Sequence, residues 1–167
     1  MENVVSLELF LPKRIAERLK KKSEKTGASE EELLVQVLSE KFGERIDPAS
    51  EVEMHLRLSE KELMEAEELL RKGDYVQASE KAWGSAAQMV KAVAAREGRT
   101  LRSHGELHRE VARIVKETGD EELRRLWQSA GMLHQNFYEN WLPREMVEGN
   151  ISDVKRFVEK LRQLLNY

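Results

Sequence analysis

The residues best suited to chemistry in this 167-residue chain are histidines that lie close to arginine, serine or tyrosine. His104 and His108 are four residues apart, so a single helix would carry both imidazoles on one face. Arg102 and Ser103 directly precede His104. An imidazole transfers protons near neutral pH, and a guanidinium binds phosphate oxygens through several N–H groups. This group of residues therefore predicts a site for a phosphate-bearing ligand.

The expected start of a helix at Ser103 and His104 strengthens this prediction. Free backbone N–H groups and the helix dipole favour an anion at such an end. Basic side chains outnumber acidic ones around it: Lys91, Arg96, Arg99, Arg102, Arg109 and Arg113 against Glu97, Glu106 and Glu110. An alternative stays open, in which Ser103 only caps the helix with Glu106 as its capping-box partner, and the arginines form a solvated rim.

A second segment carries His134 and Tyr138, again four residues apart on one expected helix face. Both would line a cleft with His104 if the two helices pack together, or both are hydrogen-bonded groups of the core. The distance between the His104 and His134 segments decides between these interpretations. The tryptophans Trp83, Trp127 and Trp141 have helical spacing and are expected in the core.

Composition excludes several classes of function. The chain has no cysteine, and its four histidines form no HExxH pattern, so neither a metal site nor a cofactor is expected. No apolar stretch has the length of a membrane span and the N-terminus lacks the pattern of a signal peptide, which predicts a cytoplasmic protein without membrane contact. A net charge of -3 means that binding of nucleic acid would depend on local patches.

The elements expected to position these residues begin with a small N-terminal module, residues 1–43. Alternating apolar residues over 4–11 predict a strand, and Pro12 begins a helix that ends at Gly27. Ser29 and Glu32 form a capping box at the start of a second helix. A lone strand and two short helices cannot bury their apolar faces alone, so we expect a homodimer or a higher homo-oligomer.

The remainder is expected to be a linker, residues 44–51, and a five-helix bundle, residues 52–167. Glycines and prolines divide the helices, and the last helix is expected to start at Asn150 or Ser152. The predicted fold class is therefore mainly α, with a strand-helix-helix module before a five-helix bundle.

The N-terminal segment SLELFLPKRIAERLKKKSEKTGASEEELLVQVLSEKF resembles a ribbon-helix-helix unit, whose strands pair between two subunits. The resemblance implies DNA recognition through strand residues, which here are Ser6, Glu8 and Phe10. Glu8 and the acidic run 30–32 would repel phosphates, so dimerisation is the favoured interpretation of this module.

The bundle resembles the helical HEPN superfamily and, within it, the archaeal PaREP family. The segments GDYVQASEKAWGSAAQMVKAVAAREG, SHGELHREVARI and MLHQNFYENW carry the resemblance. Active HEPN relatives are metal-independent ribonucleases with an arginine four to six residues before a histidine. His134 falls where that histidine is expected, but the nearest upstream arginine is Arg125, too far for the pattern. The same spacing at Arg99 to His104 and at Arg102 to His108 is readily explained by chance.

Binding of RNA or a nucleotide phosphate through Arg102, Ser103, His104, His108, His134 and Tyr138 is therefore the leading expectation. Three alternatives stay open. One is a ribonuclease of toxin type that uses His104 or His108 with Arg102. The others are a DNA-binding regulator and an antitoxin-like scaffold, both acting through the N-terminal module.

Overall fold

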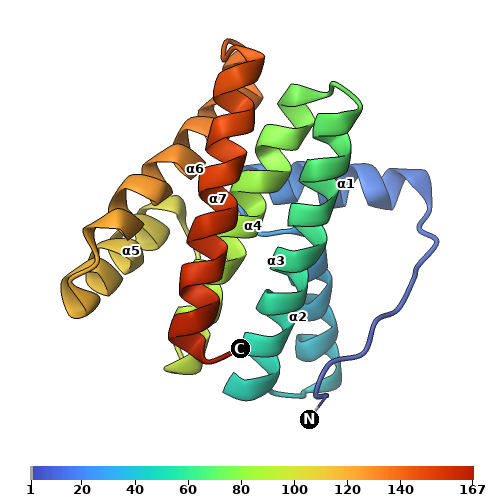
Figure 1. Cartoon of the computed structure of the whole chain (residues 1–167). Helices are drawn as coiled ribbons and strands as arrows, with labels where there is room; N and C mark the ends of the chain where they lie inside the picture. Colours follow the sequence, from blue (N-terminus) through green and yellow to red (C-terminus); the bar gives the residue numbers. More distant parts are fainter. Residues whose placement is uncertain (1) are drawn as a thin grey trace.

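A computed structural model describes residues 2–167 of the chain and shows seven α-helices in that range (Figure 1). Their bounds are α1 Lys13–Thr26, α2 Glu30–Phe42, α3 Pro48–Arg71, α4 Tyr75–Arg96, α5 His104–Thr118, α6 Glu121–Glu139 and α7 Arg144–Leu165.

Helix α4 is the centre of the fold, because it packs against α3, α5, α6 and α7. Its small residues make this possible: Ala78, Ala82 and Ala86 are completely buried and let neighbouring helices approach closely. Between α3 and α4 the serines Ser59 and Ser85 each donate a hydrogen bond to the other's backbone carbonyl, at 2.9 and 2.8 Å. Helices α3 and α4 therefore form a tightly packed antiparallel pair.

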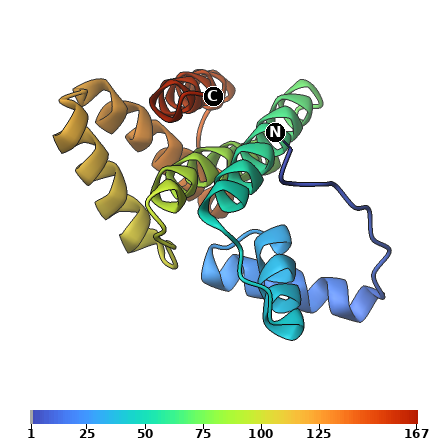
Figure 2. The same cartoon turned by 90° about the horizontal axis from the view of Figure 1, so that it is seen from below.

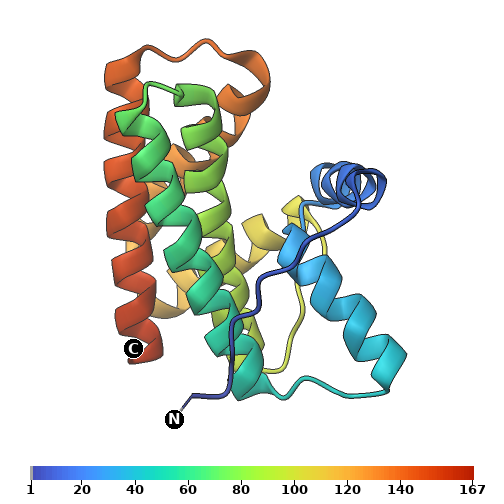
Figure 3. The ribbon, with the colours of Figure 1, turned by 90° about the vertical axis from the view of Figure 1, so that its right-hand side faces the viewer.

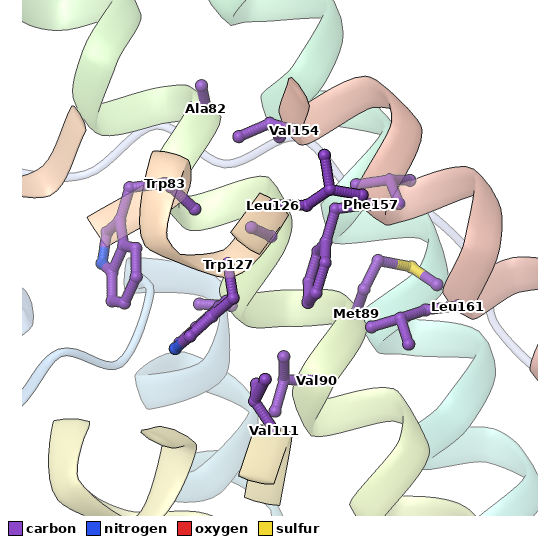
Figure 4. Close-up of a cluster of buried hydrophobic side chains, with 14 of the residues drawn as sticks. Ala82, Trp83, Met89, Val90, Val111, Leu126, Trp127, Val154, Phe157 and Leu161 are labelled. Atoms are coloured by element: carbon purple, nitrogen blue, oxygen red, sulfur yellow. The ribbon is translucent and has the colours of Figure 1, made fainter. Parts of the chain in front are cut away.

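The main core lies where α4, α6 and α7 meet (Figure 4). Trp127 and Phe157 contact each other with ring centroids 5.5 Å apart, and Met89, Val90 and Leu161 close the cluster from the sides. Helix α5 adds Val111 to the edge of this cluster. These large apolar side chains fix α6 beside α4, which decides where the histidines of α5 and α6 lie.

Helices α1 and α2 form a hairpin at the side of the other helices (Figures 2 and 3). Gly27 ends α1 in the left-handed conformation (φ 75°), and Ser29 and Glu32 form the predicted capping box of α2. The hairpin buries little apolar surface: α1 has no buried residue, and α2 has only Leu33.

A buried ion pair joins this hairpin to α4. The Lys91 ammonium donates to both carboxylate oxygens of Glu32, at 2.9 and 3.0 Å, and Gln88 Nε2 donates to the same carboxylate at 3.0 Å. His55 on α3 extends the network, with Nδ1 2.6 Å from Gln88 Oε1. The capping-box glutamate thus also fixes the position of the hairpin relative to the helices behind it.

The predicted strand-helix-helix architecture is wrong. Residues 4–11 are extended but pair with no other segment among residues 2–167, which contain no strand. The alternation of Val5, Leu7 and Leu9 favours a strand, but a strand also needs a neighbour for its backbone hydrogen bonds. These three side chains are instead 88, 80 and 51% exposed.

The prediction of a five-helix bundle also fails, since the seven helices do not divide in that way. Helix α5 packs only on α4 and α6 and lies at the edge, while the α1–α2 hairpin adds two helices on another side. Two boundaries differ as well. Helix α3 begins inside the predicted linker, at Pro48 with Asp47 as its cap, and α7 begins at Arg144 and continues through Asn150 and Ser152.

Candidate functional site

A cleft of about 980 Å³ separates the α1–α2 hairpin from α3 and from the loop between α4 and α5. The end of α1 and the turn after it form one wall, and residues 98–104 form the opposite wall. Its basic lining residues are Lys22, Arg45, Lys91, Arg99 and Arg102. Ser103 and His104 also line this cleft. The residues at the start of α5 that were predicted to bind a phosphate therefore border a cleft of the structure.

Three of the four histidines gather around Trp83 of α4. His104 and His134 stack with ring centroids 4.9 Å apart, and His134 stacks on Trp83 at 4.7 Å. His104 lies 5.9 Å and His108 6.5 Å from the Trp83 ring. The two segments that the sequence could not relate therefore meet at one place, and Trp83 is the platform that both contact.

Neighbouring side chains fix the orientation of two of these imidazoles. His134 Nδ1 lies 3.2 Å from the Glu80 carboxylate, one turn before Trp83 on α4. Trp127 Nε1 donates to His108 Nδ1 at 2.9 Å, which places the remaining proton of a neutral His108 on Nε2. Nδ1 of both imidazoles is thus engaged by a neighbouring side chain, and Nε2 is the nitrogen left for a ligand.

The environment of His104 keeps its imidazole neutral at neutral pH. Burial lowers its pKa below the ordinary value of 6.5, and the neighbouring His134 and His108 lower it further. A neutral imidazole both donates and accepts hydrogen bonds. An anion bound against it would favour the protonated form and raise the pKa.

The end of α1 lies directly against this group. A Cβ atom at Gly27 would come within 2.9 Å of His104 Cε1, so this turn approaches the imidazole more closely than any other residue type would permit. Tyr138 contacts His134 edge-on, with centroids 5.4 Å apart. Burial raises the pKa of Tyr138, and Glu80 and Glu24 of α1 add to the effect. The hairpin therefore contacts the histidine group at His104, and the charge of Glu24 on α1 acts on Tyr138.

The start of α5 shows one half of the capping box predicted as the alternative interpretation of Ser103, because the Glu106 carboxylate accepts from Arg102 and not from Ser103. Ser103 Oγ accepts from Glu106 N at 3.2 Å, and the Glu106 carboxylate accepts from the backbone N–H of Arg102. The Ser103 hydroxyl and the Glu106 carboxylate thus both accept hydrogen bonds from backbone N–H groups at the start of the helix. The Arg102 guanidinium, in contrast, is exposed and pairs with no carboxylate among residues 2–167. Arg102 is thus available to a ligand.

The local surplus of basic residues is smaller than the sequence indicates. Arg99 and Arg113 both bind the buried carboxylate of Glu110, which is 3% exposed. Although burial alone would raise the pKa of Glu110, the two arginines lower it to about 2. These arginines stabilise α5, so the cleft-lining cations without a carboxylate partner in the described part of the chain, residues 2–167, are Lys22, Arg45 and Arg102.

Other predicted residues lie elsewhere. Ser6, Glu8 and Phe10 are exposed on the extended N-terminal segment, away from the histidines. Trp83 and Trp127 are buried as expected, but Trp141 is 53% exposed. No cluster of His, Asp and Glu able to hold a metal ion occurs in residues 2–167. In the same range no helix combines the length and the apolar character needed to cross a membrane.

Sequence reasoning missed Glu80 and Gly27 as parts of this site. Glu80 is 54 residues from His134, and no spacing rule links positions so far apart. Gly27 gives a clear signal, but only for the end of a helix. Trp83 was correctly expected to be buried, while its contact with three histidines depends on how α4, α5 and α6 pack.

The arrangement offers hydrogen-bonding imidazoles, an exposed guanidinium and aromatic faces at one end of a cleft.

Comparison with known proteins adds a family to this description. A solved crystal structure of a Sulfolobus solfataricus protein is similar, with 27% sequence identity and a TM-score of 0.58 over 65% of this chain and 96% of that one. A search of the curated proteins finds no match. The family model of the archaeal PaREP1/PaREP8 family matches residues 54–158, from α3 to α7, and the chain therefore belongs to this family.

Proposed function

We propose that the protein binds RNA or a nucleotide through a phosphate group in the cleft between the α1–α2 hairpin and the start of α5. The observation that carries the proposal is the contact between His104 and His134, with ring centroids 4.9 Å apart at the wall of a cleft with free cations. Burial and the neighbouring His134 disfavour the charged form of His104, and a partly exposed group perturbed in this way at a cleft supports a binding role.

The chemistry of the cleft suits a phosphate. Arg102 supplies a guanidinium able to bind two phosphate oxygens, and Lys22 faces it from α1 as a second positive charge. His104 adds a hydrogen bond at the base of the cleft. Tyr138 is 60% exposed beside His134 and offers a face on which a base can stack.

The test is binding of a short single-stranded RNA at low and at moderate salt. We expect Arg102→Ala and His104→Ala each to weaken binding about tenfold, the effect of losing one charge-assisted contact. Fluorescence anisotropy with end-labelled RNA measures the dissociation constants. Arg125→Ala is the matched control, because Arg125 is exposed on α6 and does not line the cleft. Equal affinity of all four proteins, or no binding at either salt, contradicts the proposal.

The protein is proposed to do this as a homo-oligomer joined through residues 5–46. Among residues 2–167, ten of the fifteen large exposed apolar side chains fall in this segment, including Phe10 at 97%, Phe42 at 70% and Val37 at 59% exposure. A monomer rarely exposes so much apolar surface in one part of the chain. Because one segment carries the surface, a second copy can cover it by two-fold symmetry, with each copy using the same residues.

Sedimentation equilibrium of wild type and of Phe42→Glu tests this arrangement. We expect wild type to be a dimer or larger at micromolar concentration and Phe42→Glu to dissociate at least tenfold more readily, since a buried unpaired carboxylate opposes the contact. Met64→Glu is the control, because Met64 is also 70% exposed but lies on α3. A monomeric wild type, or equal dissociation of the two variants, would remove the homo-oligomer.

A further inference from the structure

Helix α1 carries a line of positive charge that the cleft does not use. Arg14, Arg18, Lys21 and Lys25 follow one another at spacings of four, three and four residues. At about 100° per residue, these four side chains lie within roughly 60° of each other on the helix surface. All four are exposed, and none pairs with a carboxylate among residues 2–167. We call these four residues the basic stripe.

The other side chains of α1 show that the basic stripe is a separate face. Ile15 and Leu19 point more than about 60° away from it, on the apolar side of the helix. Glu17 and Glu24 lie on a third line together with Lys13 and Lys20, where opposite charges offset each other. Glu17, four residues before Lys21, borders the basic stripe on that side, so the positive charge of α1 is greatest along the stripe itself.

The basic stripe leads to the cleft. Lys22, four residues after Arg18 and therefore its neighbour on the helix surface, lines the cleft, and Gly27 at the end of α1 touches His104. Figure 2 shows α1 running from the extended N-terminal segment to the loop between α4 and α5. With 14 residues the helix is about 21 Å long, enough to follow several successive phosphates.

We infer that the ligand is a single strand of nucleic acid of several nucleotides, with one phosphate at Arg102 and His104 and the following phosphates along the basic stripe. This inference rests on the proposed phosphate site and names its substrate class. A mononucleotide would fill only the cleft and would leave four aligned, unpaired cations without a partner. A continuous row of phosphates has the complementary charge and spacing. Single strands fit because Tyr138, exposed beside His134, is open to an unpaired base, which a duplex keeps stacked inside.

Length and salt dependence of binding test the inference. A twelve-nucleotide RNA is compared with a nucleoside 5′-monophosphate, using wild type, Arg18→Gln/Lys21→Gln and the control Lys116→Gln/Arg125→Gln. The control removes the same charge from exposed residues of α5 and α6 that pair with no carboxylate within residues 2–167. For the stripe variant we expect about tenfold weaker binding of the RNA at low salt and a salt slope reduced by about 1.4, since each phosphate contact on a single strand contributes about 0.7. Binding of the monophosphate should stay unchanged, and the control should match wild type.

The outcomes separate this inference from the proposed function. If Arg102→Ala weakens RNA binding but the stripe variant binds like wild type, the phosphate site stands and the inference is wrong. If neither ligand binds wild type, both fail. Vesicles containing phosphatidylserine serve as a further arm: stripe-dependent binding of vesicles without stripe-dependent binding of RNA would show that α1 meets a membrane surface, which overturns the inference.

Discussion

Replacing Lys91 by Met lowers the free energy of unfolding by about 3–5 kcal/mol, because the change leaves the Glu32 carboxylate charged and buried without its cation. Lys91 and Glu32 are 8 and 13% exposed, so water replaces little of the lost interaction. Gln88 and the Ser29 backbone N–H still donate to the carboxylate, but neither carries a positive charge. We expect the loss to appear first as release of the α1–α2 hairpin.

Urea unfolding gives the total effect, and hydrogen exchange of the α2 amides shows whether the hairpin is released first. Glu32→Gln should cost a similar amount, while the double variant Lys91→Met/Glu32→Gln should recover most of the loss, since it leaves no unpaired charge. Lys61→Met is the control. It breaks the exposed Glu31–Lys61 pair beside the buried one and should cost under about 1 kcal/mol. Equal losses in Lys91→Met and Lys61→Met would show that the buried pair does not hold the hairpin.

The pH dependence of this ion pair has a definite sign. Burial alone raises the pKa of Glu32, but Lys91 and His55, with the hydrogen bonds to the carboxylate, outweigh burial and leave the pKa below 4.5. A carboxyl group whose pKa is lowered by folding stabilises the folded state at any pH above its ordinary pKa. This stabilisation is lost as the pH falls through the lowered pKa. The hairpin should therefore stay in place at neutral pH and separate from α4 only in acid.

Replacing Glu62 by Gln should raise the free energy of unfolding by about 1–3 kcal/mol at pH 8, in contrast to the loss expected for Lys91→Met. Glu62 Oε2 is buried between α3 and α4 without a hydrogen-bond partner among residues 2–167, and a Cβ atom at Gly84 would come within 2.6 Å of it. Burial raises the pKa of Glu62 to about 8; Lys81 opposes the shift, whereas Glu31 and Glu32 add to it. The folded protein therefore binds a proton here that the unfolded chain loses near pH 4.5.

The stability of wild type should consequently fall between about pH 4.5 and 8, and Glu62→Gln should remove that part of the slope. Thermal unfolding at pH 5 and at pH 8 measures the difference in stability between Glu62→Gln and wild type. We expect this difference to be small at pH 5 and largest at pH 8. Glu65→Gln is the control, because Glu65 pairs with Lys81 at 2.8 Å and its loss should bring no gain. A Glu62→Gln protein that is less stable than wild type at pH 8 contradicts the assignment of Glu62 as a buried neutral acid.

Local signals in the sequence were sufficient for most helix ends, since caps act within one turn. Ser29 with Glu32 and Ser103 with Glu106 form the predicted capping contacts. The predicted start of α7 was wrong because Gly149 and Asn150 weaken a helix only by about 1 kcal/mol, which the buried Val147 and Ile151 on either side outweigh.

Long-range features could not be predicted in the same way. The apolar alternation of residues 4–11 indicates a strand, but whether a partner segment exists is a property of the whole fold. Similarly, Glu110 attracts Arg99 and Arg113 only because the packing of α5 buries it, and this removes two of the arginines counted toward the phosphate site. The residues of the candidate site were foreseen as separate groups, and their meeting at Trp83 was not.

The most direct test of the phosphate site is a pH titration of the histidine Cε1–H signals by NMR, with and without a short single-stranded RNA. Bound phosphate should raise the pKa of His104 from its lowered value and shift the signals of His104 and His134. Arg125→Ala serves as the control and should show the same changes as wild type, because Arg125 does not line the cleft. RNA that leaves the His104 signal and its pKa unchanged at saturating concentration would contradict a phosphate site at the start of α5.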